Sequence, residues 1–158
     1  MVSTSWPFWA SQTRTVWSVE PVSSRYAKES KIWFALLDRY HYLGSGPLCG
    51  AQIRYVVKSS KHGYLGALAF SSAAWALKAR DDAIGWTEGA RRANLPRVVA
   101  NDRFLILPTV QVKHLASKVL ALALARLPED WARRYQVRPV LVETFVDPTR
   151  FAGTCYQA

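Results

Sequence analysis

Apolar and polar residues recur along the first half of the chain with periods that predict one helix and one hairpin. In residues 28–40 (KESKIWFALLDRY), Ile32, Leu36 and Leu37 recur at helical spacing, which predicts an amphipathic helix. The next stretch, HYLGSGPLCG, contains three glycines and a proline and indicates a loop. AQIRYVVKS and YLGALAFSSAAW, separated by KHG, then predict the two strands of a hairpin.

The second half alternates strands and helices. EGARRANL predicts one or two helical turns, and VVANDRFLILP predicts a strand that ends at Pro108. Residues 113–135 predict a long helix that Pro128 bends or divides. RPVLVETFVD is almost wholly apolar and predicts a strand buried on both faces, and Pro148 and Thr149 suit the start of a final helix.

The order of these elements predicts an α+β or α/β fold with a mixed sheet flanked by helices. Strand, long helix and strand near the end form a βαβ unit, whose two strands lie parallel in one sheet. Residues 1–20 are rich in Ser, Thr and Trp without a stable period, so we expect an irregular arm there and one domain over 21–158.

Composition excludes several classes of protein. Half of the 158 residues are apolar, which excludes a disordered chain, and no run of eighteen apolar residues predicts a membrane span. The N-terminal residues lack the basic and apolar regions of a signal peptide, so we expect a cytoplasmic protein. Cys49 and Cys155 form no CxxC pair, which argues against a zinc ribbon and, in the cytoplasm, against a structural disulfide.

The excess of positive charge favours a polyanionic partner. Lys and Arg total 21 against 11 acids, giving a net charge of +10 and a pI near 10.0. Nucleic acid, and DNA in particular, is the partner we expect, although a solubilising surface would have the same composition. The candidate phosphate contacts on one face are Arg91, Arg92, Arg97, Arg103, Lys58 and Lys61, with Arg133, Arg134 and Arg138 beyond the long helix.

Five ordered stretches resemble one family. They are YHYLG (40–44), RDDAIGW (80–86), NDRFLILP (101–108), HLASKVLALALARLPEDW (114–131) and LVETFVDPTRFAGTCYQA (141–158). Together they resemble the DruA-like family, which is named for a component of Druantia anti-phage systems and is also found joined to transposases. The resemblance covers roughly residues 20–158 and implies a defence or mobile-element context beside nucleic acid.

In that family the last stretch continues as GTCY-x-AANW and a further strand. The resemblance therefore implies that this chain is truncated and that the C-terminal strands of its sheet are missing. A homodimer or another partner would then cover the open edge.

The element order and a late tyrosine also resemble the core of GNAT-type acyltransferases. That resemblance implies an acyl-CoA whose pyrophosphate lies at the N-terminus of the long helix, where free N–H groups favour phosphate. The GNAT loop pattern, Arg or Gln, two residues, Gly, one residue, then Gly or Ala, aligns with QVKHLA. Gln111 and Ala116 match, Lys113 lies between them, and His114 replaces a glycine, so its side chain crowds the phosphate position.

Three residues are candidates for acid–base catalysis. Tyr156 matches the GNAT tyrosine that protonates the departing thiolate, or it is an aromatic that packs against the sheet. Glu143, inside an apolar strand, is a general base or the partner of an arginine. His41 titrates near neutrality and is an acid–base group, or it caps the preceding helix.

No metal site is expected, because the paired acids Asp81 and Asp82 have no third ligand at matching spacing. Three hypotheses remain. The first is a nucleic-acid-associated DruA-like domain with a GNAT-like cleft. The second is an acyl-CoA-dependent N-acyltransferase that acts on nucleic acid or a small amine, and the third is a binding module that has lost its cofactor.

Overall fold

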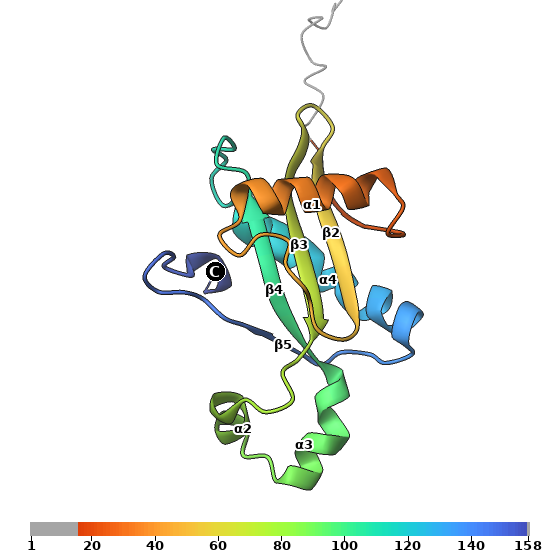
Figure 1. Cartoon of the computed structure of the whole chain (residues 1–158). Helices are drawn as coiled ribbons and strands as arrows, with labels where there is room; N and C mark the ends of the chain where they lie inside the picture. Colours follow the sequence, from red (N-terminus) through yellow and green to blue (C-terminus); the bar gives the residue numbers. More distant parts are fainter. Residues whose placement is uncertain (1–15, 158) are drawn as a thin grey trace, which may run out of the picture.

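The computed structural model describes residues 16–157, which form a mixed five-stranded sheet with helices on both faces (Figure 1). The strands lie in the order β1-β2-β3-β4-β5; the first four pair antiparallel, and β5 pairs parallel to β4. Their bounds are β1 (Trp17–Pro21), β2 (Gln52–Ser59), β3 (Gly63–Ser72), β4 (Val98–Ile106) and β5 (Leu141–Thr144).

The two long helices cover opposite faces of this sheet (Figure 1). The helices are α1 (Lys28–Tyr40), α2 (Lys78–Ile84), α3 (Glu88–Asn94) and α4 (Leu115–Tyr135), with short 3-10 turns η1 (Leu95–Arg97) and η2 (Thr154–Tyr156). Helices α2 and α3 lie beyond one end of the sheet, between β3 and β4. The α+β class, the hairpin and the β4-α4-β5 unit are confirmed.

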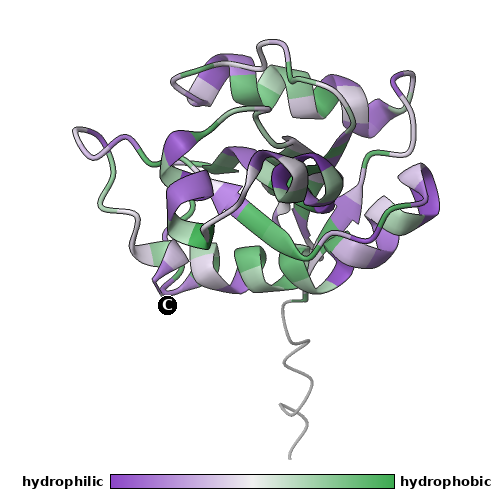
Figure 2. Ribbon diagram, turned by 90° about the horizontal axis from the view of Figure 1, so that it is seen from below, coloured by the Kyte–Doolittle hydropathy of each residue, from purple (hydrophilic) through white to green (hydrophobic). Residues whose placement is uncertain are grey.

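Successive side chains of each strand point to opposite faces of the sheet, and this divides the core into two layers. In β2, Tyr55 and Val57 belong to the cluster with α4, whereas Val56 belongs to the cluster with α1. Trp33 of α1 is fully buried, and its indole N–H donates to the Leu68 carbonyl at 2.8 Å. Figure 2 shows green, hydrophobic segments on the strands between the helices. Both faces of the central strands are therefore buried.

Two expectations about the ends of the chain are wrong within the described residues. Trp17–Pro21 form β1 inside the expected irregular arm, whose first 15 residues lie outside the described part. No final helix follows Pro148: the Asp147 carbonyl accepts from the N–H groups of Arg150 and Phe151 in a single turn that does not continue, and in the described residues only η2 comes after it.

The burial expected for β5 on both faces is wrong, and so is a division of the long helix at Pro128, one of the two effects expected of that residue. The β5 strand is not buried on both faces, because it forms an edge of the sheet among residues 16–157, and Leu141 is 38% exposed. Pro128 does not divide α4, which runs unbroken to Tyr135. The carbonyl that loses its partner belongs to Leu124, a residue on the exposed side of the helix.

The β4 and β5 strands diverge after a short paired segment. Pairing extends only from Val98 to Asn101 in β4, against Leu141–Thr144, while β4 continues to Ile106. Opposite β3, Phe70 pairs with Asn101 and Ala69 with Arg103, so Asp102 is the extra residue of a β-bulge. A bulge bends its strand and turns side chains in a new direction. The divergence therefore begins at Asp102.

Close contact between β3 and β4 at Gly66 gives a test of this sheet. A Cβ on Gly66 would lie 2.1 Å from the Leu105 carbonyl oxygen, whereas one on Gly89 in α3 would meet nothing within 4 Å. We expect Gly66→Ala to lower the free energy of unfolding by about 3 kcal/mol, because the strands must separate. Gly89→Ala, the matched control, should raise it by about 0.5 kcal/mol. Urea denaturation measures both, and equal stability of the two variants would contradict the pairing of β3 with β4.

Candidate functional site

A cavity of about 370 Å³ lies where β4 and β5 diverge. We call it the β4–β5 cleft. Its walls come from the loop after α1, the bulged part of β4, the first turn of α4 and the segment from β5 to η2, which runs beside β4 in Figure 1. Polar and small residues on these walls include His41, Asn101, Asp102, Ala116, Thr144, Cys155 and Tyr156.

Tyr156 is held in the cleft by one hydrogen bond and one aromatic contact. Its hydroxyl donates to Asn101 Oδ1 at 2.8 Å, and its ring meets Phe104 edge-on at 6.1 Å. Gly153, with φ 67°, begins the 3-10 turn that carries the tyrosine. Burial raises the pKa of Tyr156, so the phenol keeps its proton at neutral pH. It is a proton donor that faces the cleft.

Asp102 also lines the cleft, and the sequence analysis missed it. Asp102 also borders a smaller adjoining cavity that Ser71 lines, and its carboxyl accepts a hydrogen bond from the Ser71 hydroxyl. Burial raises the pKa of Asp102, which makes the carboxylate a stronger base than an exposed aspartate. The sequence pattern that could have indicated Asp102 is a charged Asp102-Arg103 pair inside a mainly apolar strand. Glu143 was singled out by the same kind of pattern.

His41 reaches the cleft from the end of α1, as both sequence interpretations allow. It is the C-cap residue of the helix, its Nδ1 accepts from the Leu43 N–H at 3.2 Å, and its ring stacks on Tyr42 at 4.9 Å. Burial, and then the nearby Arg103 charge, lower the pKa of His41 to about 4. The imidazole is therefore neutral at pH 7 and a weak base.

Glu143 does not line the cleft and forms a buried ion pair. Both of its carboxylate oxygens accept from Arg80 Nη1, at 3.2 and 3.3 Å, and the Arg80 side chain is only 4% exposed. Arg80 also bonds Asp81 at 3.0 Å, and Asp81 pairs with Arg91 at 3.3 Å. This network fastens α2 and α3 to β5. The structure thus places Glu143 as the arginine partner that the sequence analysis named as the alternative to a base.

In the loop expected to bind phosphate, His114 has the left-handed backbone conformation that favours the glycine it replaces. His114 caps the N-terminus of α4 with φ 60° and ψ 16°, a left-handed conformation that costs a non-glycine residue about 1 kcal/mol. Its side chain is exposed and does not line the cleft, and the same holds for Gln111 and Lys113. Ala116 is the member of this loop that does line the cleft.

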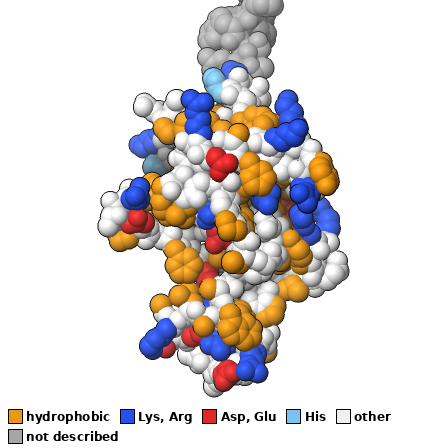
Figure 3. Space-filling view, viewed as in Figure 1, with side chains coloured by type: hydrophobic (Ala, Val, Ile, Leu, Met, Phe, Trp, Pro, Cys, Tyr) orange, Lys and Arg blue, Asp and Glu red, His pale blue; other side chains and the backbone are white. Residues whose placement is uncertain are grey.

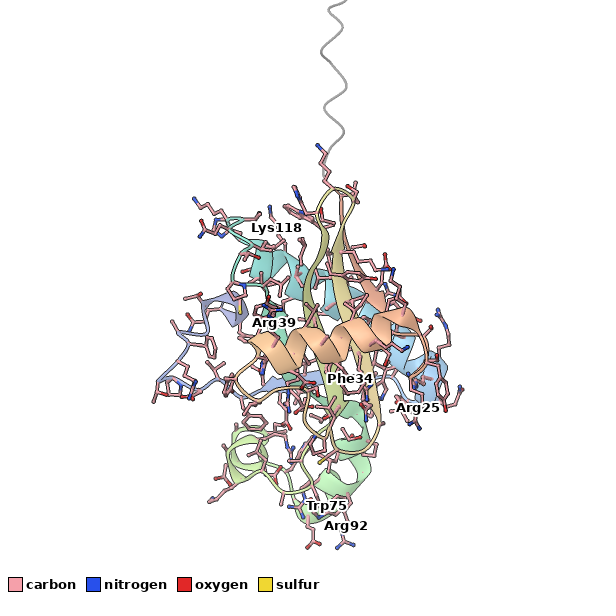
Figure 4. The ribbon with its side chains drawn as sticks, turned by 45° about the horizontal axis from the view of Figure 1, so that its top comes forward. Arg25, Phe34, Arg39, Trp75, Arg92 and Lys118 are labelled. Carbon is pink, nitrogen blue, oxygen red and sulfur yellow. The ribbon has the colours of Figure 1, made fainter. Side chains whose placement is uncertain are left out.

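The six basic residues expected on one face are dispersed. Lys58 and Lys61 lie near the β2–β3 turn, at the opposite end of the sheet from α3, which carries Arg91 and Arg92 (Figures 1 and 4). In the space-filling view, Lys and Arg form separate groups over the face that is shown (Figure 3).

Acidic groups or carbonyls already engage four of the six. Lys58 pairs with Glu20 at 2.5 Å, Arg92 with Glu88 at 2.5 Å and Arg91 with Asp81, and Arg103 donates to the Gly44 carbonyl. Among the described residues, only Arg97 and Lys61 of this set have no such partner. The structure therefore does not join the six into one surface.

The two cysteines are free thiols, and Cys155 lines the cleft, where burial raises its pKa. Among residues 16–157 there is no group of three or more His, Cys, Asp or Glu side chains that could hold a metal ion. Asp81, one of the paired acids, is instead bound by two arginines.

The sequence model of the family described as Druantia protein DruA matches residues 11–158. The chain belongs to the DruA family. No curated protein and no solved structure matches this DruA chain. Within the described part of the chain, no helix has the length and apolar character needed to cross a membrane.

The low pKa of His41 in this DruA protein predicts how its stability changes with pH. Because the folded pKa of about 4 lies below the usual 6.5, the unfolded chain binds the proton more tightly. This effect is absent above pH 6.5 and lowers the free energy of unfolding as the pH falls toward 4. We expect wild type to lose more stability over this interval than His41→Gln, measured by thermal denaturation at each pH. Parallel curves for the two proteins, or an NMR titration midpoint near 6.5, would contradict the burial of His41.

Proposed function

We propose that this DruA protein acts in anti-phage defence and that its β4–β5 cleft is a site of acyl transfer from acyl-CoA to an amine. The observation that carries the proposal is the divergence of two parallel strands, which opens a cleft beside the start of α4 and places a proton donor and a carboxylate in it. The strand order and this divergence agree with the resemblance to GNAT-type acyltransferases.

The start of α4 suits the pyrophosphate of acyl-CoA. The backbone N–H groups of Ala116 and Ser117 have no acceptor among the described residues, and the helix dipole favours negative charge there. The left-handed His114 turns the chain into the helix as the glycine of the GNAT pattern would, with its imidazole directed to solvent. Acyl-CoA would supply the acyl group as an activated thioester. The donors present therefore fit the cofactor.

The residues in the cleft divide into a proton acceptor and a proton donor. Asp102 Oδ takes a proton from an incoming amine, because burial raises its pKa and the Ser71 hydroxyl orients it. The Tyr156 hydroxyl holds the proton that a leaving thiolate requires. We assign the base to Asp102 rather than to Glu143, which Arg80 binds, or to His41, whose pKa of about 4 makes it a weak base.

Binding and transfer are separable in an experiment with acetyl-CoA. We expect calorimetry to show binding by wild type, and Tyr156→Phe and Asp102→Asn to bind equally well but transfer acetyl groups to primary amines about 100-fold more slowly. Free thiol release measures the transfer. His114→Gly keeps the left-handed backbone without its strain and should bind at least as well as wild type. No heat at millimolar acetyl-CoA would overturn the proposed site, and unchanged transfer by both cleft variants would overturn their assigned roles.

A second candidate function, association with nucleic acid, is favoured by the net charge of +10. Neutralising phosphates releases condensed counterions, so the affinity of such a protein falls steeply with salt. We expect the DruA protein to bind a short fluorescent DNA duplex at low salt and to release it at moderate salt, measured by fluorescence anisotropy. An affinity that does not change between the two conditions would overturn this function and leave the cleft unaffected.

A further inference from the structure

A second cavity, of about 340 Å³, lies at the opposite edge of the sheet from the β4–β5 cleft. It is bordered by the segment between β1 and α1, the start of β2 and the last turn of α4. Three arginines line it, Arg25, Arg54 and Arg134, and no acidic residue of the described chain is among its lining residues. We call it the three-arginine pocket. In Figure 4, the labelled Arg25 lies on the right, far from Arg92 and Lys118.

Arg54 is the fixed member of the pocket. Its guanidinium lies over the rings of Trp33 and Phe34, at 4.9 and 4.7 Å, and its Nε and Nη2 donate to Gln52 Oε1 at 3.1 and 2.8 Å. Among the described residues, its Nη1 has no acceptor. A guanidinium held in this way has lost its conformational freedom before a ligand arrives, which favours binding.

Arg25 and Arg134 are the exposed members. Neither has an ion pair within residues 16–157, and each lies over the neighbouring tyrosine ring, Tyr26 at 5.4 Å and Tyr135 at 5.6 Å. The Tyr135 hydroxyl is itself fixed, because it donates to the Gln52 carbonyl at 2.7 Å and accepts from the Gln52 N–H at 2.8 Å. Burial, and then the charge of Arg134, lower the pKa of Arg54. Two of the three cations therefore repel each other in the absence of an anion.

The acids of the chain are all engaged away from this pocket. Nine of the eleven acids form ion pairs with cations elsewhere, and the other two, Asp38 and Asp102, accept hydrogen bonds from serines. No acid of the chain is left to balance the pocket, so its charge is available to an external anion.

We propose that the three-arginine pocket binds the backbone phosphates of a nucleic acid. This inference rests on the proposed association with nucleic acid and names its site. Guanidinium groups bind phosphate oxygens through paired N–H donors, and three arginines line this pocket with no carboxylate among its described lining residues. Tyr26 is 81% exposed beside Arg25, so its ring is open for an unstacked base of a single strand.

The test compares two double variants that remove the same charge. Arg25→Gln/Arg134→Gln changes exposed side chains of the pocket and leaves the packed Arg54 intact, and Arg92→Gln/Arg97→Gln removes two exposed arginines from the α3 region. The probes are a fluorescent DNA duplex, the matching single strand and, as competitors, inorganic phosphate and a mononucleotide. We expect the pocket variant to bind at least about tenfold more weakly and to reduce the slope of log K against log salt by about 2, whereas the control changes little.

The outcomes distinguish a failure of the pocket from a failure of the association with nucleic acid. If wild type binds DNA and the two variants weaken it equally, the pocket is overturned and nucleic-acid association stands. If wild type does not bind either strand form, both are overturned. A mononucleotide that binds wild type as tightly as the oligonucleotide would make the pocket a small-molecule phosphate site and overturn its assignment to nucleic acid. Thermal denaturation of both variants shows that the comparison is between folded proteins.

Discussion

The carboxamide of Asn101 joins the sheet to the cleft. It is 4% exposed and stands at the last position where β4 pairs with β5. Its Nδ2 donates to the Ala69 carbonyl at 3.0 Å and to the Arg103 carbonyl at 3.1 Å, and therefore spans the bulge at Asp102. Its Oδ1 accepts from Tyr156. One buried side chain thus holds the bend in β4, which opens the cleft, and the tyrosine that lines it, so the two features depend on each other.

Most of the charges around this site are held in ion pairs. Glu143 lies in the paired part of β5, where Arg80 binds it outside the cleft, and Arg91 and Asp81 extend the same network. A buried charge without a partner is costly, so these ion pairs favour one position of α2 and α3 against β5. The cleft contains a neutral imidazole, a protonated phenol, the Asp102 carboxylate and the Asp147–Arg150 ion pair. Of the two carboxylates that line the cleft, Asp102 is therefore the one without an ion pair within residues 16–157.

The sequence predicted the elements whose stability is local or periodic. Helix α1, the β2–β3 hairpin, β4 and α4 follow from the spacing of apolar residues, because each buries one face or stripe that the pattern records. Helix α2 was missed because its stability depends on Arg80, whose partner Glu143 is 63 residues away. The exposure of β5 was also unpredictable, since apolar composition does not reveal whether another strand pairs beyond it.

The candidate site was predictable only in part for a related reason. His41, Ala116 and Tyr156 were expected from motifs, and the structure brings all three to one cavity. Asp102 was missed because its direction depends on a bulge, and a one-residue change of register reverses which face a side chain occupies. The positions of the free cations were unpredictable for a similar reason, because net charge does not show which basic residues form ion pairs with acids. Lys58, Arg91 and Arg92 are balanced by acids, and Arg25, Arg54 and Arg134 are not.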